Sequence, residues 1–240
     1  MPIHGSLFQD YQETTGQDPF VLQNKKLLKI NMGYGPVNAR LGSMVAYQGD
    51  VRFEKPGSGG LNKMLKKAVT GEGVDIMQAT GSGELFVADM ASEVQVFYLE
   101  NDMVSCNGAS VLAFSGSIEW DIQRIGSGAG MVAGGMYNVT LRGTGYVALT
   151  TKGDPVVLDV SGPPTFADPN AVVFWTSGVT MSVKTDTGGL KSMLRGGTGE
   201  MFQLAFGGQG YVMIQPAENV VTTGGQAAGG GGGLLGGLMG

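Results

Sequence analysis

Three stretches of the sequence alternate apolar and polar residues in the same way. They read GSMVAYQGDVRFEK (residues 42–55), GASVLAFSGSIEWDIQ (108–123) and AVVFWTSGVTMSVK (171–184). Their apolar sides carry Val45, Tyr47, Gly49, Val51 and Phe53, then Leu112, Phe114, Gly116, Ile118 and Trp120, then Val173, Trp175, Ser177, Val179 and Met181. Because successive side chains of a strand point to opposite faces, this period of two predicts that each stretch is a strand with one buried face.

A second set of landmarks repeats with nearly the same spacing. GELFVA (83–88), GYVALT (145–150) and GYVMIQ (210–215) each begin with glycine, and these glycines are 62 and 65 residues apart. Val51, Ile118 and Val179 are 67 and 61 residues apart. Units of this size cannot cover their own sheet faces and must share a core. We therefore expect an all-β fold, in which residues 19–223 form one domain of three similar lobes in a pseudo-threefold arrangement, at about 20–90, 91–155 and 156–220.

The two ends of the chain differ from this repeated body. Residues 1–18 are expected to form a flexible arm, and residues 224–240, GGQAAGGGGGLLGGLMG, a flexible glycine-rich tail. The tip of the tail is a candidate contact for a protein partner or a membrane surface, through Leu234, Leu235, Leu238 and Met239. The alternative is a tail that is disordered or packs back on the body.

Two short segments have a different period. Residues 61–69 and 190–197 place apolar residues at helical spacing, and each is expected to form a short helical cap that ends near a glycine. Three lysines of the first segment are expected to lie on its solvated face.

Composition narrows the classes of function. Glycine accounts for 43 of 240 residues, which indicates many tight turns, and the net charge of −5 provides no excess of cations to neutralise phosphates. Binding to bulk nucleic acid is therefore disfavoured. The single cysteine, Cys106, excludes an intramolecular disulfide and a multi-cysteine metal site. The beginning of the sequence lacks the pattern of a signal peptide, and no apolar run is long enough for a membrane span, so we expect a cytoplasmic protein.

The sequence contains no recognisable catalytic or cofactor motif. The single histidine, His4, lies in the expected arm, and GAGMVA (128–133) matches a dinucleotide loop only formally, because a strand-like segment follows it where a helix is needed. We expect no enzyme activity, no cofactor and no metal. Trp120 and Trp175 could stack nucleic-acid bases, but both lie on the apolar side of their strands, which favours core packing.

One part of the sequence resembles a known family. LLKINMGYGPVNARLGSMVAYQGDVRFE (27–54), together with the TGE triplets at 70–72 and 198–200, resembles the mitochondrial-biogenesis family called altered inheritance of mitochondria type twenty-four, and especially its bacterial members. The resemblance implies three β lobes related to the tryptophan RNA-binding attenuation protein, of the double-stranded β-helix type, with strands exchanged between lobes. It implies no enzyme activity. For mitochondrial members it implies a role in organising the inner membrane.

We therefore expect a non-enzymatic scaffold or assembly protein that acts through self-association and through contacts with proteins or membrane surfaces. A homo-oligomer is expected, with a trimer as the leading state. An RNA- or small-ligand-binding module is the alternative that the family's fold suggests, and an enzyme with an unrecognised site is a third.

Overall fold

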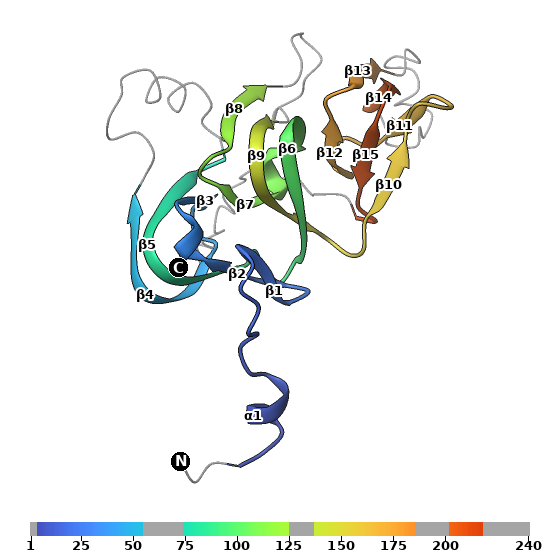
Figure 1. Ribbon diagram of the computed structural model, residues 1–240. Helices are drawn as coiled ribbons and strands as arrows, with labels where there is room; N and C mark the ends of the chain where they lie inside the picture. Colours follow the sequence, from blue (N-terminus) through green and yellow to red (C-terminus); the bar gives the residue numbers. More distant parts are fainter. Residues whose placement is uncertain (1–3, 55–73, 125–136, 186–201, 218–240) are drawn as a thin grey trace, which may run out of the picture.

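A computed structural model describes residues 4–54, 74–124, 137–185 and 202–217 (Figure 1). Antiparallel strands dominate these residues, which confirms the expected all-β class. The predicted helical caps at 61–69 and 190–197 and the loop at 128–133 lie outside the described residues.

One large sheet contains twelve strands. Along its path the strands are β1 (Phe20–Asn24), β2 (Leu27–Asn31), β5 (Ile76–Val87), β3 (Val37–Arg40), β7 (Val111–Ser115), β9 (Tyr137–Thr151), β6 (Glu93–Asn107), β12 (Val172–Thr176), β15 (Tyr211–Ile214) and β10 (Val156–Asp159). Two further strands pair beside this path: β4 (Met44–Glu54) with β5, and β8 (Glu119–Arg124) with β9. Neighbours in space are therefore often distant in sequence.

A smaller sheet completes the body. Its order is β11 (Thr165–Ala167), β14 (Phe202–Gly208) and β13 (Val179–Thr185). The helical elements are short: α1 (Leu7–Asp10), and the 3-10 turns η1 (Met32–Tyr34) and η2 (Gly108–Ser110). In Figure 1, α1 stands well apart from the strands, and β4 and β10 lie on opposite sides of the body.

Buried apolar side chains of the described residues gather in three clusters. The first includes Leu28 and Leu85, the second Phe114 and Leu141, and the third Leu204. The clusters do not follow the expected sequence boundaries strictly, since Leu112 and Ala148 of β7 and β9 belong to the first cluster. The division into three pseudo-threefold lobes stays a prediction.

The alternating pattern correctly predicted which side chains face the core near the centre of each repeat. Three side chains pack against the clusters and their neighbours in sequence are exposed: Phe53, Trp120 and Met181 face inward, and Arg52, Glu119 and Thr180 face outward. The period of two therefore holds over residues 51–54, 118–120 and 179–181.

The pattern was wrong at the beginning of β4. Val45 and Tyr47 were expected on the buried face, yet their side chains are 60% and 48% exposed. Val51 and Phe53 of the second half of β4 join the first cluster, whereas none of the three clusters of the described residues includes a residue of its first half. The apolar face of the strand extends beyond the core that it helps to form.

The second and third repeats are each two strands rather than one. β7 ends at Ser115 and β8 begins at Glu119, with a turn between them in which the Ile118 amide donates to the Ser115 carbonyl at 3.0 Å. Gly116 in this turn lies so close to Pro36 that an added Cβ would be 2.7 Å from the proline carbonyl oxygen. In the third repeat the chain leaves the large sheet after β12 and enters the small sheet at β13. Both breaks depend on contacts outside the repeat.

A Gly-x-Gly sequence lies in or next to the strands that pair with each repeat. All six glycines have positive φ: Gly81 and Gly83, Gly143 and Gly145, and Gly208 and Gly210. Gly83 lies opposite Gly49 of β4, where a side chain on Gly83 would overlap the Gln48 carbonyl oxygen. Glycine is therefore required here both by the backbone angle and by the close approach of the two strands.

Candidate assembly surface

Lys29 is buried although it lies on the face of β2 that points away from the core. Its neighbours Leu28 and Ile30 are fully buried, so alternation along the strand places the lysine side chain on the opposite face. That face would be open to water if nothing covered it. Lys29 is nevertheless 2% exposed, because the chain that precedes β1 folds across it. Both faces of β2 are therefore covered.

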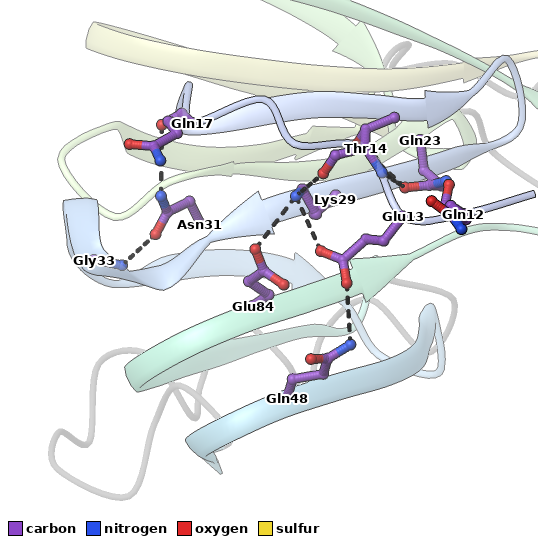
Figure 2. A network of polar contacts seen from close by, with 10 residues as sticks. All are labelled: Gln12, Glu13, Thr14, Gln17, Gln23, Lys29, Asn31, Gly33, Gln48 and Glu84. Carbon is purple, nitrogen blue, oxygen red and sulfur yellow. Dashed lines mark hydrogen bonds and ion pairs between the residues drawn. The ribbon is translucent and has the colours of Figure 1, made fainter. Parts of the chain in front are cut away.

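Two carboxylates and a carbonyl surround the Lys29 ammonium group (Figure 2). The Nζ atom lies 3.0 Å from Glu13 Oε1 and 3.3 Å from Glu84 Oε1, and it donates to the Thr14 carbonyl oxygen. Glu84 belongs to β5, whereas Glu13 and Thr14 precede the first strand. A single buried cation thus joins the N-terminal segment to two strands of the large sheet.

Further hydrogen bonds hold this segment along its length. The Gln23 side chain of β1 accepts from the Thr14 amide and donates to the Gln12 carbonyl, each at 2.9 Å. Gln48 of β4 donates to Glu13 Oε2 at 3.2 Å. We call residues 12–17 the docked segment, since the carbonyl of its last residue also accepts from Asn31 at 3.5 Å. The expected flexible arm, 1–18, includes this segment; its mobility stays a prediction.

The Lys29 cation and the Glu13 carboxylate each favour the charged form of the other. Burial alone would lower the pKa of Lys29, but its hydrogen bonds to Glu13 and Glu84 outweigh burial and raise it. The pKa of Glu13 is lowered, first by its hydrogen bond with the Glu84 carboxyl group and then by Lys29. Lys29 is therefore a fully partnered cation, unlike a catalytic lysine, whose pKa is lowered to make it a base or nucleophile.

Beyond the docked segment, the chain presents apolar side chains to solvent. Leu7 and Phe8 of α1 are 62% and 46% exposed, and Tyr11 is 77% exposed. The docked segment fixes the point from which these residues project, as Figure 1 shows for α1. Because exposed apolar groups gathered on one short element are typical of contact sites, the arm is a candidate for interaction with another chain.

The second exposed feature is the edge of β4. Within the described ranges, its eleven residues pair with β5 on one side and with no strand on the other. The backbone groups of that free edge are available to a further strand. Met44, Val45 and Tyr47 add exposed apolar surface beside it. We call this edge, with its outward side chains, the β4 edge.

The other residues considered as candidate contact or catalytic groups lie outside the described residues or away from the Lys29 network. Leu234, Leu235, Leu238 and Met239 of the tail lie outside the described residues. His4 is exposed ahead of α1. Cys106 is fully buried, and burial raises the pKa of its thiol. No cluster of three metal-binding side chains occurs among the described residues. The part of the chain that the structure describes has no helix long and apolar enough to cross a membrane.

The two tryptophans pack as the sequence predicted. Trp175 is 7% exposed in the third cluster, and Trp120 packs against the second, with its ring centroid 6.3 Å from that of Phe114. Sequence reasoning did not identify Lys29 or its partners. The available signal was a lysine in the middle of the apolar strand LLKIN, a position that requires a buried counter-charge.

Comparison with known proteins places this fold in a family. The family model described as "Mitochondrial biogenesis AIM24" matches residues 20–217, which include every strand from β1 to β15. The chain belongs to the AIM24 family. The docked segment and α1 precede residues 20–217, the part of this AIM24 chain that the family model matches.

A solved structure shares the fold of this AIM24 protein. It is the crystal structure of protein SPYM3_0169 from Streptococcus pyogenes, which is 22% identical in sequence. The match has a TM-score of 0.66 and covers 83% of this chain and 92% of that chain. No curated protein matches the chain. The comparisons therefore give the family and the fold.

Proposed function

We propose that this AIM24 protein is a non-enzymatic assembly protein that associates with itself and with a protein or membrane surface. The observation that carries the proposal is the β4 edge, eleven residues long and free on one side among the described residues. Free edges of this length favour pairing with another strand unless proline, a covering segment or charge of one sign blocks them, and the exposed Asp50 and Arg52 of β4 have opposite signs. Self-association covers such an edge without a second gene product.

The arm supports the same proposal. Its exposed Leu7, Phe8 and Tyr11 project from a docked segment that is held by the buried Lys29. An anchored apolar element suits contact with another chain, because anchoring reduces the conformational entropy that binding must remove. The alternative, RNA or ligand binding, receives less support, since Trp175, a ring that could stack a base, is buried.

Light scattering on the full-length protein and on a chain lacking residues 224–240 tests the proposal. We expect both proteins to be homo-oligomers, because the β4 edge remains in the truncated chain. Co-sedimentation with lipid vesicles and pull-down from lysate should weaken when the tail is removed. A monomer at all concentrations, with no change in binding on truncation, would contradict the proposal. The proposal includes the cytoplasmic location that the sequence favours, which cell fractionation tests.

A further inference from the structure

The β4 edge carries a charge pattern that is complementary to itself. Asp50, Arg52 and Glu54 alternate along one side of the strand and are exposed, whereas Val51 between them is buried in the first cluster. Val51 thus attaches β4 to the body, while no strand of the described residues pairs with the backbone edge beside it. The Asp50 and Arg52 side chains, 69% and 74% exposed, lie 3.1 Å apart within one chain. Both remain accessible to a second strand.

We propose that β4 pairs antiparallel with β4 of a second copy, about a two-fold axis at Val51. The inference rests on the proposed self-association and names its contact. In this register Arg52 of each copy lies opposite Asp50 of the other, so the axis creates the same attractive pair twice. Opposite charges placed directly across two strands stabilise their pairing, and like charges oppose it. The pairing extends over residues 48–54, most of the strand.

The two adjacent registers, with axes at Arg52 and Asp50, are disfavoured by the same charges. An axis at Arg52 places the two arginines opposite each other and Asp50 opposite Glu54. An axis at Asp50 places the two aspartates opposite each other. An axis at Phe53 pairs Arg52 with Glu54, but it keeps only residues 52–54 of β4 in the pairing, since the strand ends at Glu54. The axis at Val51 is the register that combines attraction with length.

The axis at Val51 also places Gly49 opposite Phe53 of the second copy. An aromatic side chain across from a glycine covers backbone that would otherwise face water. The partly buried Phe53 already contacts the exposed Tyr47, with ring centroids 5.5 Å apart, so the pairing would bring the aromatic side chains of the two copies together. A two-fold contact closes on itself, and this pairing therefore produces dimers rather than the trimer that the sequence favours.

Two charge reversals test the contact. Asp50→Lys places a lysine opposite Arg52 of the other copy, and Arg52→Glu places a glutamate opposite Asp50 of the other copy. We expect each substitution to raise the dissociation constant of the dimer about tenfold or more, because two attractive pairs become repulsive. An equimolar mixture of the two variants should dimerise again, since every charge then meets its opposite across the interface. Glu100→Lys, which makes the same charge change as Asp50→Lys at an exposed position of β6, is the control.

The outcomes separate the inference from the proposed function. Analytical ultracentrifugation of each variant, alone and mixed, supplies the dissociation constants, and circular dichroism confirms that each variant is folded. If the single variants associate as well as Glu100→Lys does, the β4 contact is wrong and self-association stands. A wild-type protein that forms trimers would have the same meaning. A wild-type protein that is monomeric at high concentration would overturn both. Recovery in the mixture supports the two-fold register, because a contact within one chain could not be restored by mixing.

Discussion

The ammonium group of Lys29 lies 3.0 Å from Oε1 of Glu13, a residue sixteen positions earlier in the chain. This contact joins a segment without regular structure to the middle of a strand. The lysine is buried, whereas the Glu13 side chain is 38% exposed. The cation therefore depends on its partners, while the carboxylate could turn to water. Removing the charge of Lys29 and removing that of Glu13 should therefore lower the free energy of unfolding by different amounts.

Lys29→Met should lower the free energy of unfolding by about 1–3 kcal/mol, the usual cost of losing hydrogen bonds to charged groups. Methionine keeps the buried stem of the side chain, so the change reports mainly on the ammonium group. Denaturant unfolding measures the loss. Lys26→Met, at an exposed position in the turn before β2, is the matched control and should stay within about 0.5 kcal/mol of wild type. Equal stability of the two variants would show that the network contributes nothing.

The network should respond to pH with a predictable sign. The folded pKa of Glu13 is lowered from its ordinary value of 4.5, so its contribution to stability is present above that pH and is lost as pH falls through the folded pKa. The pKa of Lys29 is raised above 10.5, so its contribution is present below that pH and is lost only above it. Across neutral pH both contributions are constant.

Glu13→Gln tests the expected loss of stability at acid pH. Urea unfolding of wild type and variant, between about pH 3 and pH 7, should show a stability difference at neutral pH that shrinks as pH falls below 4.5. The variant cannot lose a charge at this position, which is why the two curves should converge. A difference that is independent of pH would mean that Glu13 acts through its shape rather than its charge.

Gly83→Ala should destabilise the protein by about 2–4 kcal/mol, because the residue has φ of 122° and its added methyl group would overlap the Gln48 carbonyl oxygen. Thermal and denaturant unfolding both report the loss. Gly207→Ala is the control: an added Cβ at Gly207 meets no atom within 4 Å. We expect little change for the control. Tolerance of alanine at Gly83 would show that β4 and β5 can separate without penalty.

Phe114→Ala should cost about 3–5 kcal/mol, since this side chain is fully buried in the second cluster. Its ring neighbour Trp120 is only partly buried, so Trp120→Ala should cost less, about 2–3 kcal/mol. Denaturant unfolding of both variants gives the comparison. If Trp120→Ala lowers the free energy of unfolding by less than about 1 kcal/mol, the ring is exposed and stacking of nucleic-acid bases on it again becomes an alternative.

The sequence predicted features that depend on neighbours along the chain. The alternation around Val51 identified the strand and its buried face, because a period of two is a property of the strand itself. The Gly83 and Gly145 landmarks proved to be positions of positive φ. The first glycine of each Gly-x-Gly was not singled out, although Gly81 and Gly143 repeat with the same spacing of 62 residues.

What escaped prediction depends on contacts between distant parts of the chain. Nothing local marks Glu13 as a partner of Lys29, because the pairing exists only after β2 and β5 have come together. The same applies to the turn at Gly116, which the nearby carbonyl of Pro36 requires. Val45 is exposed because no buried cluster of the described residues reaches the first half of β4, and the alternating pattern of the strand carries no signal of this.

The position of β3 between β5 and β7 has a consequence for synthesis on the ribosome. Strands β1 to β5 pair with one another within residues 20–87, so this part can form as soon as β5 has emerged. The other edge of β3 pairs with residues 113–115, which are made later. A nascent chain of intermediate length therefore carries an open strand edge at Val37–Arg40. Such an intermediate can bind neighbouring nascent chains or a chaperone before the large sheet is complete.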